Sequence, residues 1–233
     1  MAKMFLEGKK ALVTGGSRGI GFQICRILLE NGANVLAVSR DTAKLYQAKT
    51  DLQALDTLQA DVSIPTDNDR VAAWIQDTWG YLDILVNNAG VSPVNSGALS
   101  NLTDEEFEET LLVNVFGPYI CTKRMLPLLL KSDDPRIVNV GSTSGIMSPT
   151  LKGVYGVSKA AIHALTIAMS NEFMGKVAVN ALSPGWVRTD MAPTGPGDPR
   201  TSAEATLWLV TQVKEVTGKL FHDKTEIGWS SHL

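Results

Sequence analysis

The sequence has little of what marks several classes of protein. It contains two cysteines and three histidines, and neither type shows a metal-ligand spacing. No apolar run reaches the roughly 18 residues of a membrane span. A formal net charge of −3 provides no basic field for nucleic acid or anionic lipid. We therefore expect no metal, nucleic-acid or membrane partner, and interpret Cys25 and Cys121 as packing residues. Because residues 1–8 are too polar for a secretory signal, we expect a cytoplasmic protein.

What is present is an alternation of short apolar runs with longer helical patterns. Such alternation predicts βαβ units and a mainly parallel sheet covered by helices on both faces. No linker or repeat interrupts the series, so residues 1–233 are expected to form one doubly wound α/β domain. The predicted strands are Ala11–Thr14, Asn34–Val38, Thr57–Ala60, Ile84–Asn87, Arg136–Val140, Val177–Leu182 and Lys219–His222.

Capping signals mark several expected helix starts. Thr103 and Thr201 are each followed three residues later by glutamate, the pattern of a capping box, and Asp41 is placed to cap another helix. A run from residue 152 to 173 is predicted to be helical. Residues 190–201, rich in proline and glycine, predict a short loop before the last helix.

One pair on the helix at 152–173 carries the strongest hint of chemistry. Tyr155 and Lys159 lie one turn apart, on a stripe that continues through apolar positions. A buried ammonium is expensive unless it serves a purpose. A fixed positive charge beside a phenol predicts a lowered tyrosine pKa and so a general acid or base, and Ser142 is placed to hold the oxygen that exchanges the proton. The alternative is a core tyrosine beside a snorkelling lysine.

A glycine-rich turn follows the first predicted strand and opens an amphipathic helix. Its sequence from residue 14 is TGGSRGIG, with the spacing G-x-x-x-G-x-G. Glycines allow a tight turn and close approach to a pyrophosphate, and the helix N-terminus supplies free N–H groups. The turn therefore indicates a dinucleotide site, although a purely structural turn is the other interpretation.

Six motifs in register resemble the short-chain dehydrogenase/reductase family. They are Thr14-Gly15-x3-Gly19-x-Gly21, Asn87-Asn88-Ala89-Gly90, Asn114, Ser142, Tyr155-x3-Lys159 and Pro184-Gly185-x-Val187-x-Thr189. The resemblance covers roughly residues 8 to 222. It implies a three-layer Rossmann fold with a seven-stranded sheet, a nicotinamide cofactor, and Asn114, Ser142, Tyr155 and Lys159 as catalytic residues.

The resemblance also implies how the cofactor is held. The second strand ends at Ser39-Arg40 without the acidic residue that favours NAD, so Arg40 and Arg18 predict binding of a 2′-phosphate and hence NADP(H). Two solvated surface arginines are the alternative, and for Asp61 the alternative to an adenine contact is a turn-forming role. The implied cofactor-binding residues are Gly15, Ser17, Arg18, Gly19, Ile20, Gly21, Ser39, Arg40, Asp61, Val62, Asn88, Ala89, Gly90, Tyr155, Lys159, Pro184, Gly185, Val187 and Thr189.

The helix after residue 103 contains a local conflict. Phe107, Leu111, Asn114 and Pro118 fall on one predicted buried stripe, and a buried asparagine needs partners. Pro118 has no N–H for the carbonyl of Asn114, four residues earlier, so a kink with a free, inward-facing carbonyl is expected. In the family the matching asparagine holds a water of a proton relay. A kinked packing helix with a satisfied asparagine is the alternative.

The expected function is NADPH-dependent reduction of a ketone or aldehyde, with Tyr155 as proton donor. Ser144 competes with Ser142 for the role of the catalytic serine. A dehydratase, an epimerase or a non-catalytic NADP(H)-binding sensor or scaffold are the rivals. The substrate is expected to be a small molecule bound by loops at 91–96, 144–150 and 192–200, and the absence of an inserted lid favours an open cleft. Helices from Thr103 and Lys152 resemble those that pair in family homodimers and homotetramers.

Overall fold

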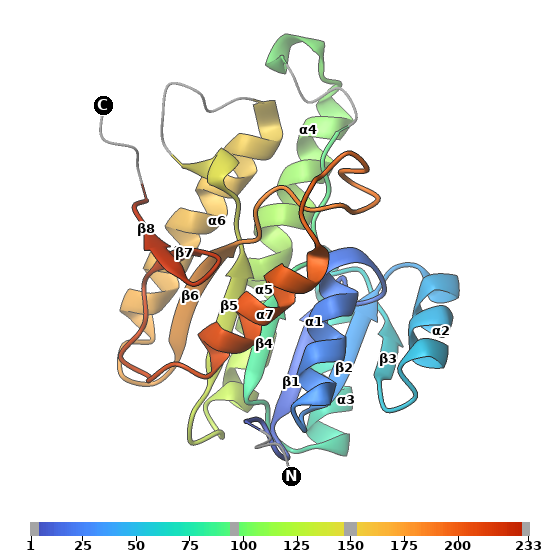
Figure 1. The fold of residues 1–233 in the computed structure, drawn as a ribbon, viewed down its shortest axis with the longest axis vertical. Coiled ribbons are helices and arrows are strands. Elements are labelled where there is room, and N and C mark those ends of the chain that lie inside the picture. The colour runs from blue at the N-terminus through green and yellow to red at the C-terminus, as the bar shows by residue number, and fades with distance from the viewer. Residues whose placement is uncertain (1–4, 94–97, 147–152, 230–233) are drawn as a thin grey trace.

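The computed structural model describes residues 5–93, 98–146 and 153–229. These residues place one sheet between two layers of helices (Figure 1). The strands are β1 Lys10–Thr14, β2 Asn34–Ser39, β3 Asp56–Gln59, β4 Ile84–Asn87, β5 Arg136–Val140, β6 Ala178–Ser183, β7 Leu220–His222 and β8 Thr225–Ile227. The α-helices are α1 Gly19–Glu30, α2 Thr42–Asp51, α3 Pro65–Thr78, α4 Asp104–Leu111, α5 Gly117–Leu129, α6 Gly153–Glu172 and α7 Pro199–Val210. Short turns of other helix types are η1 Leu99–Asn101, η2 Leu112–Phe116 and η3 Thr143–Gly145.

The strand order is β3-β2-β1-β4-β5-β6-β7-β8, and all neighbours except β7 and β8 run parallel. Each of the seven predicted strands is present with ends within one residue of the prediction. The predicted count of seven is one too low, because β8 adds an antiparallel edge after a turn at Asp223. β8 has three mostly exposed residues, so no apolar pattern announced it.

Side chains alternate between the two faces of the sheet and build two cores. Val13, Ala37 and Val138 pack with α1, α2 and α7 on one face. Leu12, Leu36 and Ile137 pack with α3, α5 and α6 on the other face. These strands are buried on both sides, which is why they are continuous apolar runs in the sequence.

A buried polar network joins the sheet to the helices behind it. The Asn87 carboxamide nitrogen donates to Thr122 Oγ1 at 3.1 Å and to Asn139 Oδ1 at 2.9 Å. Asn139 in turn donates to Thr166 Oγ1 at 2.9 Å. These bonds fix the positions of four elements relative to one another, namely β4, β5, α5 and α6. They therefore determine where α6 lies along the ends of the strands.

Two of the three expected helix starts are confirmed. Thr103 and Glu106 form a complete capping box at α4, and Asp41 accepts a bond from the Lys44 backbone N–H at α2. The start expected at Thr201 is wrong. Helix α7 begins at Pro199 with Asp198 as its N-cap, because proline at the first position and aspartate before it make the stronger start signal.

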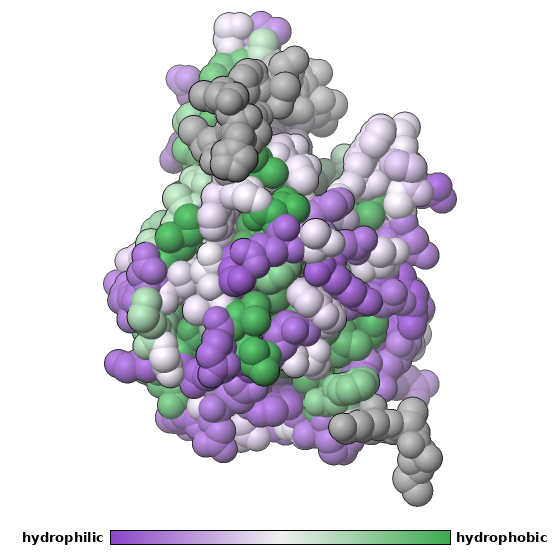
Figure 2. Space-filling view, turned by 60° about the vertical axis from the view of Figure 1, so that its left-hand side comes forward, coloured by the Kyte–Doolittle hydropathy of each residue, from purple (hydrophilic) through white to green (hydrophobic). Residues whose placement is uncertain are grey.

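The described surface is mixed in character. On the face shown in Figure 2, hydrophobic residues lie in separate groups among hydrophilic ones. Within the described ranges, no helix combines the length and apolarity that crossing a membrane requires. Both cysteines are buried free thiols, in agreement with their interpretation as packing residues.

We predict that Asn139→Leu lowers the free energy of unfolding by about 2–3 kcal/mol, because it removes partners from two buried polar groups. Denaturant unfolding followed by circular dichroism measures this change. Asn101→Leu, the same substitution at an exposed position, serves as the control and should change stability by less than about 0.5 kcal/mol. Equal effects of the two substitutions would show that the network contributes nothing specific.

Candidate active site

A cavity of about 360 Å³ lies at the carboxyl ends of the parallel strands. The strand order reverses between β1 and β4, and open α/β sheets bind ligands in the crevice at such a switch point. The wall includes Gly15 after β1, Ser39 ending β2, Asp61 after β3, Asn88 after β4 and Pro184 after β6. Segments far apart in the sequence therefore meet at one edge of the sheet.

The glycine turn between β1 and α1 forms one wall of this cavity. Gly15 has φ of +65°, and a Cβ there would lie 2.9 Å from the Ala89 Cα. A Cβ on Gly21 would lie 2.2 Å from the Gly15 carbonyl oxygen. Larger residues at both positions would force the turn apart. The side chain of Arg18, the N-cap of α1, makes no capping bond, so that helix end keeps N–H groups for an anion.

The end of β4 is tied to the glycine turn. The Asn88 carboxamide donates to the carbonyl oxygens of Thr14 and Gly15 at 2.8 and 3.2 Å. The Thr14 hydroxyl accepts bonds from the backbone N–H groups of Asn88 and Ala89. These bonds fix the two turns against each other and hold the cavity open between them.

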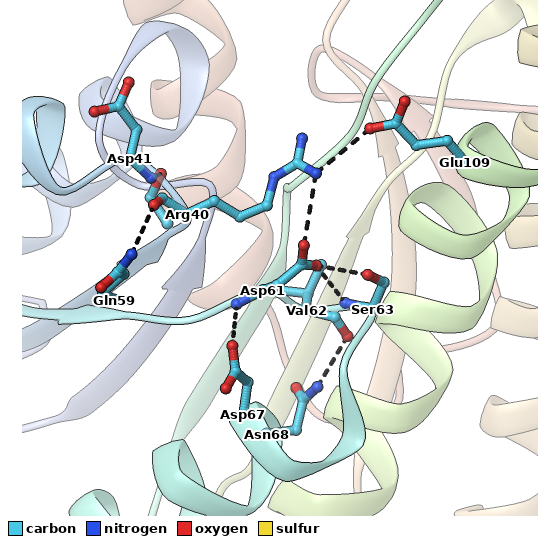
Figure 3. Close-up of polar contacts among 10 residues, drawn as sticks. Arg40, Asp41, Gln59, Asp61, Val62, Ser63, Asp67, Asn68 and Glu109 are labelled. Atoms are coloured by element: carbon cyan, nitrogen blue, oxygen red, sulfur yellow. Dashed lines mark hydrogen bonds and ion pairs between the residues drawn. The ribbon is translucent and has the colours of Figure 1, made fainter. Parts of the chain in front are cut away.

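Arg40 reaches over the cavity from the end of β2 (Figure 3). Its Nη1 lies 3.5 Å from Asp61 Oδ2 and 3.4 Å from Glu109 Oε1, whereas Asp41 points the opposite way. Asp61 also accepts bonds from the backbone and hydroxyl of Ser63 at 2.9 and 2.6 Å. Asp61 therefore has the turn-forming role that was the alternative, and at the same time lines the cavity.

Lys159 projects from α6 to the far end of the cavity. The residue is 5% exposed, and its Nζ donates to the Val140 carbonyl oxygen at the end of β5 at 2.8 Å. The predicted stripe continues through Ile162, Thr166 and Met169, all of which are buried. Burial lowers the pKa of Lys159 to about 8. One carbonyl dipole thus holds a charge that the apolar surroundings disfavour.

Tyr155 lies beside this lysine, with Lys159 Nζ 5.6 Å from the centre of its ring. The expectation of a lowered tyrosine pKa is wrong for the protein alone. Burial raises the pKa of Tyr155, and the hydrogen bond with Ser142 opposes this only in part. The reason is that the phenol is itself largely buried, and desolvation disfavours its charged form.

The two candidate serines occupy different environments. Ser142 is half-buried at the end of β5, where its Oγ accepts a bond from the Ser144 backbone N–H at 3.1 Å. The Ser142 hydroxyl keeps its proton for a further bond, and it lies close enough to Tyr155 to lower the pKa of the phenol. Ser144 is exposed and supports Ser142 through its backbone. The geometry therefore favours Ser142.

Asn114 lies behind the cavity in a π-helical turn. The predicted interruption of the helix takes this form over Leu112–Phe116, before Pro118 in the first turn of α5. The Asn114 side chain exchanges two 2.8 Å bonds with the Val91 backbone and donates to Ser158 Oγ at 3.0 Å. Phe107 does not share its buried stripe but is 40% exposed, because a π-turn rotates the residues before it away from those after it.

The segment after β6 folds into a compact turn. Bonds pair Thr189 with Ala192 through their backbones, and Arg188 and Trp186 with Gly197. Thr189 lines the cavity, whereas Gly185 and Val187 do not contribute to its wall. Asn114 and Ser142 are likewise outside the lining. Parts of the expected substrate loops at 91–96 and 144–150 lie outside the described residues.

Two charged residues beside the cavity were not predicted from the sequence. Asp190 lines it from the turn after β6, and Lys44 approaches from α2. Both contact one another, with Lys44 Nζ 3.4 Å from Asp190 Oδ2. The adjacent Thr189 was predicted, but nothing in the sequence indicates a contact that spans residues 44 and 190.

Comparison with known proteins decides the family. The sequence profile described as short chain dehydrogenase matches residues 9–197. The chain belongs to this family. Its similar proteins include the 3-oxoacyl-acyl-carrier-protein reductase of Vibrio cholerae, 34% identical over 94% of this chain and 97% of that protein. The rhamnolipid-biosynthesis 3-oxoacyl-acyl-carrier-protein reductase of Pseudomonas aeruginosa is 37% identical over 84% of this chain and 79% of that protein.

Solved structures of other family proteins superpose closely on this short-chain dehydrogenase. The Pseudomonas aeruginosa RhlG/NADP active-site complex gives a TM-score of 0.87 at 32% identity, covering 95% of this chain and 97% of that one. An actinorhodin polyketide ketoreductase with NADPH gives 0.86 at 28% identity, with 92% and 95% covered. The Rossmann-type fold is therefore established.

We predict that Gly141→Ala destabilises the protein, because the added Cβ would lie 2.4 Å from His163 Nε2. The expected loss in the free energy of unfolding is about 1–3 kcal/mol. The double variant Gly141→Ala/His163→Ala should recover most of that loss relative to His163→Ala alone, as measured by a thermodynamic cycle in urea. Strict additivity would show that the two residues do not compete for space.

Lys159 also makes stability depend on pH. Its pKa is about 8 in the folded protein and about 10.4 when unfolded. Unfolding therefore takes up a proton between these values, so the free energy of unfolding should rise from pH 8 to pH 10. Lys159→Met should lack about 2 kcal/mol of this rise. Lys176→Met, an exposed control, should retain it, and urea titrations at each pH decide between them.

Proposed function

We propose that this protein reduces a ketone or aldehyde to an alcohol with NADPH, reversibly. One arrangement carries the proposal: Tyr155 and Lys159 line one end of a cavity whose other walls suit a dinucleotide, and Ser142 lies next to Tyr155 just outside the lining. The glycine turn, the end of α1 and the strand ends fit a pyrophosphate and its riboses. When bound, the nicotinamide supplies a hydride to the carbonyl carbon, while the protein supplies the proton to its oxygen.

Tyr155 is the proposed proton donor. Because burial raises its pKa, the phenol holds its proton across the physiological range and is ready to give it to a developing alkoxide. Ser142 would donate a hydrogen bond to the same oxygen and polarise the carbonyl. Lys159 is the nearby positive charge that stabilises the phenolate after transfer. We further propose that Asn114 supports a relay water, since its side chain fixes the Val91 backbone in the loop after β4.

NADP(H) is the proposed cofactor. Arg18 and Arg40 both line the cavity, and β2 ends at Ser39 followed by Arg40, without an acidic residue at the strand end. Arginine forms charge-assisted bonds with phosphate, so either guanidinium suits a 2′-phosphate. The NADP and NADPH complexes of the similar structures support this assignment. Asp61 and Val62 are proposed to contact the adenine, and the Val187 backbone and Thr189 the carboxamide.

The substrate class proposed is a ketone rather than an aldehyde. Two similar proteins are named 3-oxoacyl-acyl-carrier-protein reductases and one similar structure is a polyketide ketoreductase, and each of these names describes reduction of a ketone. The segment 184–198 between β6 and α7 carries no inserted helix, and its Trp186 and Met191 are exposed. A ketone with an apolar chain suits such a rim.

The assembly proposed is a homodimer or homotetramer. Phe107 on α4, Leu112 in η2 and Tyr119 on α5 are between 38% and 40% exposed. α4 and α6 also contact each other, so their outer surfaces are neighbours. Pairing of these helices with a second copy would bury the apolar side chains. The cytoplasm is the proposed compartment, because NADPH and thiols are kept reduced there.

The rival proposal is a protein that binds the cofactor without turnover. Tyr155→Phe distinguishes the two, because it removes the phenol proton and leaves the ring. We expect kcat/KM for NADPH-dependent reduction of acetoacetyl-coenzyme A or a simple ketone to fall by about 10²–10⁴-fold. Tyr46→Phe, at a position 76% exposed on α2, is the control and should leave the rate unchanged.

Spectrophotometric assays with NADPH and NADH over a panel of ketones and aldehydes measure these rates. The assignment of the cofactor requires a higher kcat/KM with NADPH than with NADH. Activity that survives Tyr155→Phe would refute the proton donor. Tight binding of NADPH without turnover of any carbonyl would favour the sensor.

A further inference from the structure

Three charged residues from three different elements meet at the rim of the cavity. Arg18 precedes α1, Lys44 lies in the first turn of α2, and Asp190 lies in the turn after β6. One oxygen, Asp190 Oδ2, bonds to Arg18 Nη1 and lies 3.4 Å from Lys44 Nζ. This carboxylate therefore joins the glycine turn, α2 and the turn after β6 across the opening.

The cluster is accessible and only partly neutralised. The side chains of Arg18, Lys44 and Asp190 are 55%, 43% and 64% exposed. Asp41 is the other acid nearby, with Oδ2 3.9 Å from Lys44 Nζ. The hydrogen bond from Arg18, helped by that from Lys44, lowers the pKa of Asp190, so the carboxylate stays charged. Exposed ion pairs of this kind contribute about 0–1 kcal/mol each.

Two cations that converge on one carboxylate oxygen can bind a phosphate in the same way. A phosphate carries more charge and more acceptor oxygens than a carboxylate, so it is the stronger ligand for the same pair. Arg18 also lines the cavity beside the free end of α1. Arg40, the other arginine of the rim, faces Asp61 and Glu109 and is separate from this cluster.

We propose that Asp190 determines cofactor specificity by occupying the cations that the 2′-phosphate of NADP(H) needs. The phosphate displaces the carboxylate from Arg18 and Lys44, and the turn at Thr189–Ala192 is released from the rim. NADH lacks this phosphate, so it leaves Asp190 in place. Lys44 is thereby a second phosphate-binding cation. The inference rests on the proposed function only for the cofactor class.

The test uses nucleotide fragments that carry no nicotinamide. Calorimetric titration compares 2′,5′-ADP, which carries the 2′-phosphate, with 5′-AMP, which does not. Asp190→Asn should lower the Kd for 2′,5′-ADP by about three- to tenfold and change the Kd for 5′-AMP by less than about twofold. Asp77→Asn alters the net charge equally on exposed α3, makes no contact with the cluster, and should change neither.

A second variant guards against a distorted turn in Asp190→Asn. Lys44→Gln should raise the Kd for 2′,5′-ADP by about threefold and leave the Kd for 5′-AMP unchanged. Hydrogen exchange gives an independent measure, because 2′,5′-ADP should speed exchange in the peptide containing Thr189–Ala192 and 5′-AMP should not. Thermal unfolding confirms that each variant is folded.

The outcomes separate this inference from the proposed reaction. If Asp190→Asn weakens the binding of 2′,5′-ADP, or changes the Kd of both nucleotides equally, the carboxylate does not compete with the 2′-phosphate for the cations. The inference is then wrong. If neither nucleotide binds the unmodified protein, the inference and the cofactor assignment both fail. If the fragments behave as expected but no carbonyl is reduced, only the proposed reaction fails.

Discussion

The hydrogen bond from Lys159 to the Val140 carbonyl is the interaction on which the candidate site depends. It places a positive charge at the end of β5, on a lysine that is only 5% exposed. A free ammonium there would be too unfavourable, and a lysine turned to solvent would leave Tyr155 without a charge nearby. The bond also ties α6 to the sheet beside Ser142. This one contact thus sets both the position of α6 beside Ser142 and the position of the positive charge beside Tyr155.

Burial also explains the state of Tyr155. Burial of the phenol raises its pKa, and the neighbouring Ser142 opposes this only in part. A protonated phenol is the form that reduction requires, and a fixed cation is what the phenolate requires afterwards. The protein without its cofactor is therefore set for donation, and the charge of Lys159 contributes once the proton has left.

Much of the fold could be predicted from the sequence because the pattern of apolar residues in each segment matches the burial of that segment in the folded protein. Strands buried on both faces need continuous apolar runs, and seven strands follow from that rule. β8 escaped because an exposed edge strand of three residues needs no apolar side chains. Phe107 was misplaced because one π-turn changes the phase of a helix, which a 3.6-residue period cannot express.

The candidate site was predictable where a motif lies within one element or one turn, as at Gly15, Tyr155 and Lys159. It was not predictable where charge pairs across elements. Arg18 was identified as a phosphate ligand from its place in the glycine turn, yet its partner Asp190 is far along the chain. An exposed arginine finds whichever acid the fold brings near, and the sequence pattern carries no information on that choice. Here carboxylates face both Arg18 and Arg40, so the affinity of the site for a phosphate depends on these acids as well as on the cations.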